Sequence, residues 1–307
     1  MARVRVPGSS ANLGPGFDAI GLAVELYNEF ELTEAETGLE IEVEGDGSGQ
    51  IPCGPENLAY RAAKRVFDLT GRHPGGLRMR IQNDVPLTRG LGSSAAAIVG
   101  GMVAANELAG SPLSREDVLD LATAMEGHPD NIAPALLGGV IVAVVEGGRV
   151  YYHRFLPPGD LTLVLAIPDF QVETKAARGI IPRTVPLEDA VHNLGHASLL
   201  IAALMAGRWD LLRVATHDRL HQPYRTRLVP GMIQAFHDAL EAGADGVALS
   251  GSGPTLLAFA HKDPGQVGSA MAGAFSAAGV SCRIITSPVA AAGAEVLSPA
   301  ALTAVNR

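Results

Sequence analysis

The run from Gly90 to Ser94 carries the residue types that bind a phosphate group. It follows a strand predicted at residues 77–82 from alternating apolar and polar side chains, and it leads into a helix predicted at residues 95–108. Glycines let the backbone come close to an anion, and the first turn of a helix presents unpaired N–H groups to it. We interpret this run as a cradle for the phosphates of a nucleotide.

Three other interpretations of the same run differ in strength. The P-loop pattern is absent, because no Gly-Lys pair occurs in the chain. Gly90, Gly92 and Ala95 meet the dinucleotide-binding pattern formally, but the predicted helix is followed by another helix start near Ser114 instead of a strand. Taken alone, the run is explained equally well by a glycine turn that is capped by Ser93 and binds no ligand.

Two further stretches combine carboxylates, amides and imidazole. Asn12 and Asp18 lie in a glycine-proline loop, where an Asx turn and a helix cap are the simpler interpretations. Glu126 offers an oxygen ligand suited to Mg²⁺. Asp130 lies four residues further on and could equally be the N-cap of a short helix.

Lysine is scarce, which restricts how phosphates could be bound. Lysine occurs only at Lys64, Lys175 and Lys262, so backbone amides, arginines and a metal ion must neutralise most of a phosphate's charge. Arg178 and Arg225 are the arginines in the remaining candidate stretches, although lone arginines are usually solvated.

The elements that must position these side chains form an α+β pattern. Strands are predicted at residues 3–6, 22–33, 40–44 and 161–167, a hairpin at 140–155 and a strand–turn–strand unit at 245–259. Helices are predicted at residues 57–69, 114–125, 187–206 and 266–278. Because strands and helices do not alternate strictly, we expect α+β architecture, with domains at residues 1–156 and 157–307. Residues 7–16 are expected to be a loop, and residues 288–307 are expected to be loosely held.

The composition limits the class of protein. With 307 residues, 47% hydrophobic and 18% charged, the chain is long enough for a large core. A net charge of −9 disfavours binding to nucleic acid or to an anionic membrane. The N-terminus has no apolar signal segment, and Cys53 and Cys282 lie far apart in the sequence. We expect a cytoplasmic protein.

Three stretches in order along the chain resemble the signatures of the GHMP kinases. They are Pro7 to Asp18, Pro86 to Ala96 and Ser250 to Thr255, and the resemblance covers nearly the full length. Within that family, residues 10–18 and 127–135 resemble the homoserine kinases. The resemblance implies a two-domain GHMP kinase fold with mixed and antiparallel sheets and a ferredoxin-like second domain. It also implies MgATP as phosphoryl donor, L-homoserine as acceptor, and a homodimer.

The resemblance also assigns roles to residues. Ser94 and Glu126 would hold Mg²⁺, and Asn131 would orient the substrate. The substrate site would comprise Asn12, Asp18, His128, Thr174, Arg178 and Arg225. The ATP site would comprise Pro86, Leu87, Thr88, Arg89, Gly90, Leu91, Gly92, Ser93, Ser94, Ala95, Ala96, Gly251 and Gly253. These roles agree with the chemistry of an amino-acid substrate, since its ammonium needs an anion such as Asp18 and its carboxylate needs guanidinium groups.

Two questions stay open at this point. Whether a general base exists is undecided, because Asp130, Asn131 or no residue could occupy that position. The acceptor could be another small alcohol of the mevalonate or sugar type, and a non-catalytic nucleotide-binding member of the family is a further alternative, although it would be expected to have lost Ser94 or Glu126.

Overall fold

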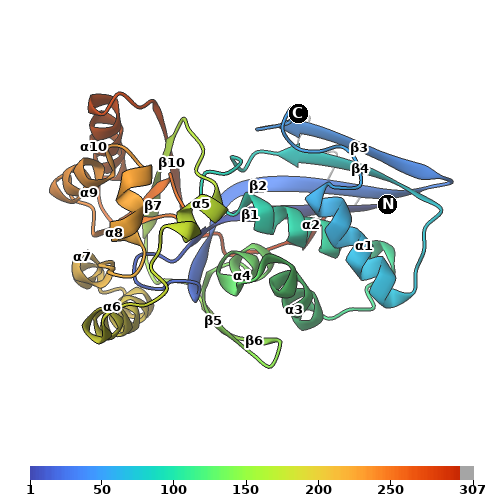
Figure 1. Cartoon of the computed structure of the whole chain (residues 1–307), viewed down its shortest axis with the longest axis horizontal. Helices are drawn as coiled ribbons and strands as arrows, with labels where there is room; N and C mark the ends of the chain where they lie inside the picture. Colours follow the sequence, from blue (N-terminus) through green and yellow to red (C-terminus); the bar gives the residue numbers. More distant parts are fainter. Residues whose placement is uncertain (298–307) are drawn as a thin grey trace.

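A computed structural model describes residues 1–297, which form two sheets (Figure 1). In the first sheet the strand order is β11-β1-β2-β4-β3, and the hairpin β5–β6 is joined to β2. β3 is parallel to β4, whereas the other pairs are antiparallel. The strands are β1 (Ala2–Ala11), β2 (Ile20–Ala35), β3 (Gly38–Gly45), β4 (Gly76–Asn83), β5 (Val140–Glu146), β6 (Arg149–Phe155) and β11 (Glu295–Val296).

Four helices lie on one side of this sheet (Figure 1). They are α1 (Leu58–Thr70), α2 (Ser93–Leu108), α3 (Arg115–Glu126) and α4 (Pro129–Leu137). α2 is the central one, and it contains the glycine pair Gly100-Gly101. A Cβ at Gly100 would lie 2.1 Å from the Phe30 ring, and one at Gly101 would lie 2.1 Å from the carbonyl oxygen of Ala59. These glycines therefore let α2 pack tightly between β2 and α1.

The second sheet has the order β10-β7-β9-β8 and is antiparallel throughout. Its strands are β7 (Thr162–Pro168), β8 (Gly246–Leu249), β9 (Leu256–Ala260) and β10 (Cys282–Ser287). Its helices are α5 (Thr174–Gly179), α6 (Leu187–Ala206), α7 (Leu212–Ala215), α8 (Gln222–Arg225), α9 (Met232–Glu241) and α10 (Pro264–Ala277). Along the chain, β7 is followed by helices, then by β8 and β9, then by α10 and β10. This is the ferredoxin-like order, and it confirms the expected fold class.

The first strand is longer than its sequence predicts. Residues 7–16 are expected to be a loop, but β1 continues to Ala11 and pairs with β2 along its whole length. The register shifts between Pro7 and Gly8, and such a bulge is one of the few places where a sheet accepts proline. The prediction of a loop is therefore wrong for residues 7–11, and the strand delivers Asn12 to the site.

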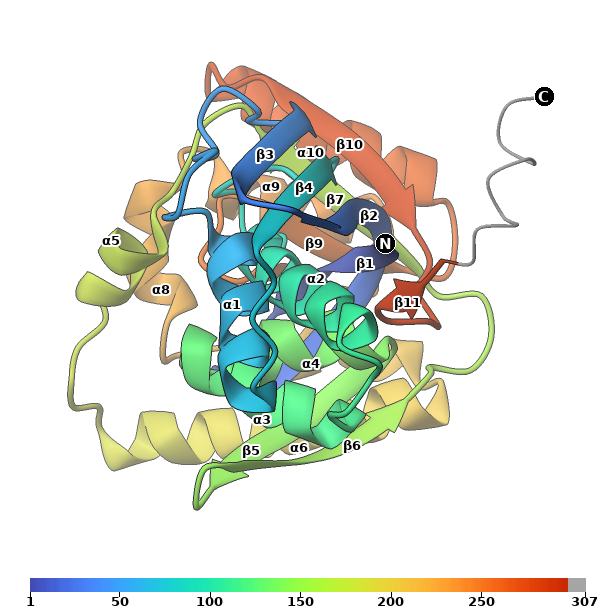
Figure 2. The same ribbon diagram turned by 90° about the vertical axis from the view of Figure 1, so that its right-hand side faces the viewer.

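The C-terminal segment returns to the first sheet, as the strand β11 beside β1 in Figure 2 shows. The amide of Ala290 donates to Ala23 O at 3.0 Å, and the amide of Leu297 donates to Arg3 O at 2.8 Å. The expectation of a loosely held end is therefore wrong for residues 288–297. Residues 298–307 lie outside the described residues.

The two sheets do not have fully separate cores. The core beside β7 and β9 includes Leu13, Leu22 and Leu91 from the first half of the chain, packed with residues such as Leu163. The expected division after residue 156 lies between β6 and β7, and it stays a prediction. Within residues 1–297, no helix has the length and apolar character needed to cross a membrane.

Candidate active site

The glycine loop has the geometry that its sequence predicts for binding an anion. Gly90 and Gly92 have φ values of +77° and +69°, and Gly92 is the N-cap of α2, so the first backbone N–H groups of α2 point out of the helix. A Cβ at Gly90 would lie 2.2 Å from Ser250 O, and one at Gly92 would lie 2.0 Å from Ser9 Oγ. Both positions therefore require glycine.

The glycine loop at residues 250–254 packs against the glycine loop at residues 90–92. The hydroxyl of Ser250 donates to Gly90 O at 2.6 Å, and the amide of Thr255 donates to Arg89 O at 3.3 Å. The amide of Gly251 donates to Ala11 O at 3.0 Å, which ties in the end of β1. Three stretches that are far apart in the sequence therefore meet at one point, where both halves of the chain contribute.

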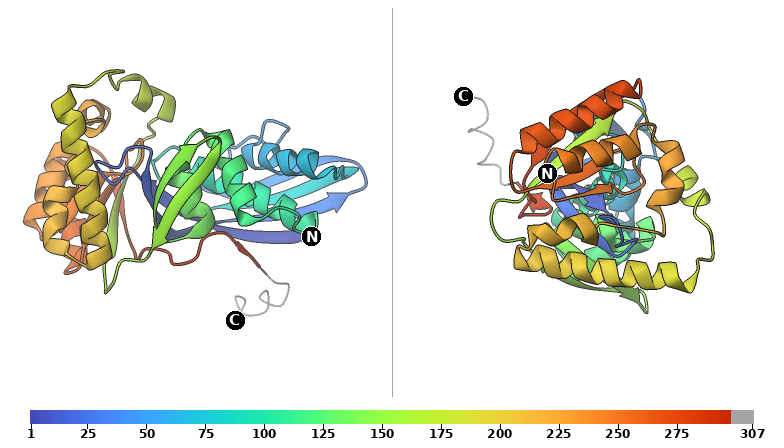
Figure 3. Two further views of the ribbon diagram at one scale, coloured as in Figure 1. Left: turned by 90° about the horizontal axis from the view of Figure 1, so that it is seen from below. Right: turned by 90° about the vertical axis from the view of Figure 1, so that its left-hand side faces the viewer.

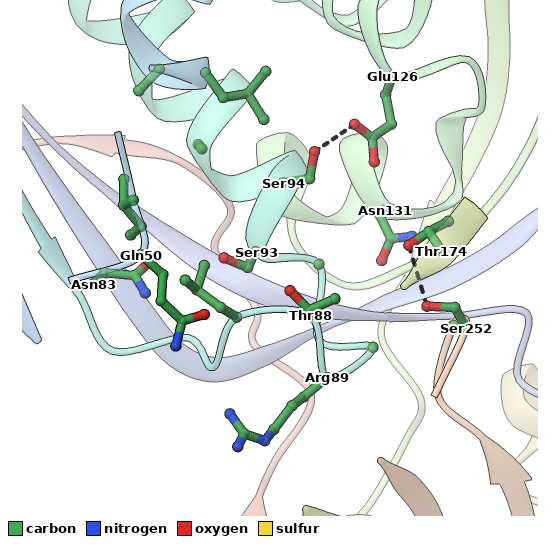
Figure 4. Close-up of a pocket in the computed structure, with 18 of the residues that line it drawn as sticks. Gln50, Asn83, Thr88, Arg89, Ser93, Ser94, Glu126, Asn131, Thr174 and Ser252 are labelled. Carbon is green, nitrogen blue, oxygen red and sulfur yellow. Dashed lines mark hydrogen bonds between the residues drawn. The ribbon is translucent and has the colours of Figure 1, made fainter. Parts of the chain in front are cut away.

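A cavity of about 370 Å³ runs along this meeting point. One end is mainly apolar, and the other end is polar and charged. Figure 4 shows Gln50 and Asn83 on one side of the start of α2 and Asn131, Thr174 and Ser252 on the other. The apolar end is lined by Phe30, Ile51, Pro52, Leu58, Ile81, Leu87 and Ala97, and the polar end by Asn12, His128, Asp130, Asn131, Thr174, Arg178 and Arg225.

Ser94 and Glu126 face each other across the cavity wall (Figure 4). Ser94 is in the first turn of α2, Glu126 is the last residue of α3, and the Ser94 hydroxyl donates to Glu126 Oε2 at 2.8 Å. A hydroxyl and a carboxylate beside a phosphate-binding helix end are hard oxygen donors, which fit Mg²⁺. The two residues therefore suit the metal role expected of them.

Arg178 and Asp18 form a bidentate ion pair at the polar end, with N–O distances of 2.6 and 2.9 Å. Hydrogen bonding to Asp18 is the main reason why the pKa of Arg178 is raised above its usual value. Both side chains are about one-third exposed, and Arg178 lines the cavity. The sequence places these residues 160 positions apart and gives no sign that they pair with each other.

Arg225 is buried beside this pair, with only 2% of its surface exposed. Its guanidinium donates to Ala177 O at 3.2 Å and to Gly251 O at 2.9 Å. Burial, and then the charge of Arg178, lower the pKa of Arg225 to about 10. Two guanidinium groups thus lie close together beside Asp18.

His128 and Asp130 form a further close contact at the start of α4, between His128 Nδ1 and Asp130 Oδ1. Burial lowers the pKa of His128, but the contact with Asp130 outweighs burial and the pKa is raised overall. His128 is the N-cap of α4, so the alternative in which Asp130 caps this helix is wrong. Asn131 accepts a hydrogen bond from Ser9 Oγ at 2.9 Å, which fixes its amide at the cavity wall.

The cavity collects most, but not all, of the predicted site residues. Every predicted substrate or metal residue lines it except Asp18, which is bonded to Arg178. Thr174 reaches it from α5, with its hydroxyl 3.4 Å from Ser252 Oγ. Of the predicted ATP residues, those that line the cavity are Leu87, Thr88, Arg89, Gly90, Gly92, Ser93, Ser94 and Gly251, whereas Pro86, Leu91, Ala95, Ala96 and Gly253 do not.

Two groups of residues in the site are missed by sequence reasoning. Residues 50–52 and 56–59 also line the cavity. Residues 57–59 belong to the start of a predicted helix, and the only sequence signal at residues 50–52 is the apolar-proline pair Ile51-Pro52. His221 is fully buried, accepts from Arg225 at Nδ1 and donates from Nε2 to Gly14 O at 2.7 Å. No local pattern identifies His221, because its contacts come from distant segments.

Both units of the chain match one protein family. Residues 57–139 match GHMP kinases N terminal domain, and residues 200–277 match GHMP kinases C terminal. The chain belongs to the GHMP kinase family, and it is an ATP-dependent kinase. α2 is followed by α3 and not by a strand, so the dinucleotide-binding interpretation of this run is wrong.

The relatives specify a branch of that family. The homoserine kinase of Moorella thermoacetica is 49% identical over 285 residues, covering 92% of this chain and 96% of that protein. The homoserine kinase of Symbiobacterium thermophilum is 50% identical over 310 residues, covering 97% and 95%. The crystal structure of homoserine kinase from Cytophaga hutchinsonii matches with a TM-score of 0.88 at 31% identity, covering 96% and 97%.

The fold is shared more widely. The crystal structure of L. major mevalonate kinase in complex with R-mevalonate matches with a TM-score of 0.71 at 18% identity, covering 94% of this chain and 96% of that one. At that identity the likeness concerns the fold alone.

Proposed function

We propose that this protein is a homoserine kinase that transfers the γ-phosphoryl group of MgATP to the hydroxyl of L-homoserine in threonine biosynthesis. The products are O-phospho-L-homoserine and ADP. The observation that carries the proposal is the charge arrangement at the polar end of the cavity, where Arg178 and Arg225 line the wall and Asp18 is bonded to Arg178. An amino acid has one ammonium and one carboxylate, and this arrangement offers a partner to each.

ATP would occupy the cavity with its base at the apolar end and its phosphates over the start of α2. The N–H groups there and the dipole of the helix favour negative charge. Lys64, Lys175 and Lys262 do not line the cavity, so backbone amides replace the lysine of a P-loop. Ser94 and Glu126 would hold Mg²⁺, which neutralises phosphate charge when bound.

Homoserine would separate the Asp18–Arg178 ion pair. Its ammonium would take Asp18 as partner, while Arg178 would turn to the carboxylate together with Arg225. One partly exposed ion pair in the free protein is thereby exchanged for two charge-assisted contacts with the ligand. A substrate lacking either charge leaves one protein group unpaired, which is a physical basis for selecting an amino acid.

The hydroxyl of homoserine would lie beside Asn131, which orients it toward the γ-phosphate. Its oxygen forms the new bond to phosphorus, the bond from phosphorus to the β–γ bridging oxygen breaks, and ADP leaves. The hydroxyl proton passes to an oxygen of the transferred group. Asp130 is already engaged by His128, so we assign it to holding that side chain and assign no general base. Positioning and charge neutralisation are the main requirements of such a transfer.

Cellular location and domain division complete the proposal. A cytoplasmic protein agrees with the free thiols of Cys53 and Cys282. We place the boundary between an N-terminal ATP-binding domain, residues 1–156, and a C-terminal domain, residues 157–307, in the connection between β6 and β7.

An ATP-coupled assay over L-homoserine, L-serine, L-threonine, mevalonate and galactose tests the proposal. We expect turnover with homoserine far above that with the other four, and no turnover with homoserine would contradict the proposal. Turnover only with mevalonate or galactose would favour the other-alcohol alternative. An Arg225→Lys variant purified identically should raise the KM for homoserine at least about tenfold, since lysine lacks the planar fork. A contaminating kinase would not respond to that substitution.

A further inference from the structure

Three histidines meet where α6 packs beside α7. His192 and His196 lie four residues apart on α6, and their ring centroids are 3.7 Å apart. His217 follows α7, and its ring centroid lies 6.0 Å from that of His196. These three side chains do not belong to the lining of the cavity described above. Figure 3 shows α6 on the outside of the molecule in both views, and His217 is exposed, so an ion in solution can reach the cluster.

The ring nitrogens of this cluster are suited to bind a ligand. His196 Nδ1 lies 2.7 Å from His192 O, and because a carbonyl only accepts, Nδ1 carries the proton and Nε2 keeps its lone pair. Histidines that bind metals usually have their second nitrogen held by such a partner. His192 Nε2 is buried and has no hydrogen-bond partner within residues 1–297. A buried nitrogen without a partner is unfavourable, and a bound ion would remove that cost.

Two of the three imidazoles are neutral near pH 7. Burial, and then the charge of His196, lower the pKa of His192 below its usual value, and the same two causes lower the pKa of His217. A metal ion competes with protons for the imidazole lone pair, so a ring that is already neutral binds the ion without first losing a proton.

The charged groups around the cluster are already paired with one another. Arg219, which follows His217 by two residues, forms an ion pair with Asp189 at 3.2 Å. Arg213, on α7, forms one with Glu241 at 3.2 Å. An incoming cation therefore meets arginines whose charge is compensated by a neighbouring carboxylate.

The backbone of the cluster is fixed, so only side chains must move to bind an ion. Asn193 on α6 is buried, donates from Nδ2 to Asp218 Oδ1 at 2.8 Å and accepts from the amide of Arg219 at 2.9 Å. These bonds hold the segment that carries His217 against α6. The ring planes of His192 and His217 are inclined by 24° and 23° to that of His196. Nearly parallel rings do not direct their nitrogens to one centre, and rotation of the side chains would bring them there.

We propose that His192, His196 and His217 form a binding site for a divalent d-block metal ion such as Zn²⁺, separate from the Mg²⁺ site proposed at Ser94 and Glu126. Two histidines four residues apart on one helix face have the spacing with which helical zinc motifs hold the metal. Imidazole nitrogen suits zinc, nickel and copper, whereas Mg²⁺ requires oxygen ligands. Three protein nitrogens at about 2.0–2.1 Å and one water complete a tetrahedral zinc site.

A bound ion would join α6 to the segment that leads into the substrate site. Asp218, next to His217, accepts hydrogen bonds from the amides of His221 and Gln222 at 3.0 and 2.6 Å. Gln222 begins α8, the short helix that ends at Arg225. The ion would therefore stabilise the folded protein at the base of α8, without contacting the reacting groups.

Isothermal titration of the chelator-treated protein with ZnCl₂, without ATP, tests the proposal. We expect a site that millimolar Mg²⁺ does not displace. Loss of an outer-shell partner alone weakens metal binding about 10- to 100-fold, so His196→Ala, which removes a ligand, should weaken this site at least about 100-fold. The matched control is His237→Ala on α9, because His237 is an exposed histidine beside a carboxylate, Asp238, at 3.2 Å. Circular dichroism checks that both variants are folded.

A second set of donors could compete for zinc and is tested separately. Donor atoms of Asp18, His128 and Asp130 lie within 4.8 Å of one another in the cavity, although Asp18 is paired there with Arg178. We expect His128→Ala to keep the histidine site on α6. Zinc that is retained at full affinity by His196→Ala and lost by His128→Ala overturns the proposal.

Thermal unfolding gives an independent measurement. Saturating zinc should raise the Tm of the wild type and of His128→Ala by at least about 3 °C, and should leave that of His196→Ala unchanged. A wild type that binds no zinc at about 100 μM, or that gains no stability from it, also overturns the proposal. Neither measurement uses homoserine or ATP, so their outcome is separate from the test of the proposed function.

Discussion

Replacement of Asp18 by asparagine is the sharpest test of how the charged end of the cavity selects its substrate. In the proposed complex Asp18 binds the ammonium group of homoserine, after giving up Arg178. An asparagine at this position would keep the size of the side chain but lose its charge. The deaminated analogue 4-hydroxybutanoate has the same hydroxyl and carboxylate and lacks only the ammonium. We therefore expect Asp18→Asn to remove much of the preference for homoserine over this analogue.

The size of the effect follows from the two contacts that are exchanged. A hydrogen bond between charged groups contributes about 1.5–3 kcal/mol. The ion pair with Arg178 is about one-third exposed on each side, and such pairs contribute about 0–1 kcal/mol, which must be subtracted. The net preference is then about 0.5–3 kcal/mol, or roughly 2- to 150-fold in kcat/KM. In the variant the preference should fall toward unity.

The measurement is kcat/KM for both substrates at saturating MgATP, in wild type and variant. Glu34→Gln is the matched control, because Glu34 forms a similar two-bond ion pair with Arg72, at comparable exposure and outside the cavity. The control should leave the preference unchanged. If Asp18→Asn keeps the full preference for homoserine, or raises the KM for ATP in parallel, the assignment of the ammonium to Asp18 is wrong.

Three further outcomes are expected. Glu126→Gln should raise the Mg²⁺ concentration for half-maximal activity at least about tenfold, measured by titration at fixed ATP, because an amide is a weaker ligand. Gly90→Ala should lower the free energy of unfolding by about 2–4 kcal/mol, because its Cβ would lie 2.2 Å from Ser250 O. The control Gly71→Ala has a similar φ and no neighbour within 4 Å, so it should lower the free energy of unfolding by only about 1 kcal/mol. Burial lowers the pKa of His221, so its imidazole takes up a proton at higher pH in the unfolded chain than in the folded protein. The free energy of unfolding should therefore fall as the pH drops below about 6.5. Denaturant titrations should show that this free energy depends less on pH in His221→Asn.

Elements with local causes could be predicted from the sequence. The helix at residues 187–206 has the bounds expected of it, and α3 begins after Ser114, whose side chain and that of Asp117 form a capping box. The pair Gly100-Gly101 inside a predicted helix is also a local signal, and the Phe30 ring lies against Gly100. Periodicity, caps and glycines act within a few residues, so they can be recognised without knowing the fold.

Features with distant causes could not be predicted in the same way. Asp18 and Arg178 are expected to bind opposite charges of the substrate, and nothing within their own segments indicates that they contact each other. The strand β1 extends to Ala11 because β2 pairs with it beyond the bulge at Pro7, although the sequence there has the glycine, serine and proline content of a loop. Ile51 and Pro52 line the cavity together with Ile81 and Leu87, which follow later in the chain.

The return of the C-terminal segment has a consequence for folding during synthesis. β1 leaves the ribosome long before β11, which covers one of its two edges at Val4 and Arg5. Its other edge can pair with β2 as soon as residues 20–35 have emerged. Until β11 has been translated, this part of the nascent first sheet therefore keeps an exposed edge, which is a template for pairing with other chains. Pairing of β11 closes that edge, and the ion pair of Arg5 with Glu295 then joins the two strands.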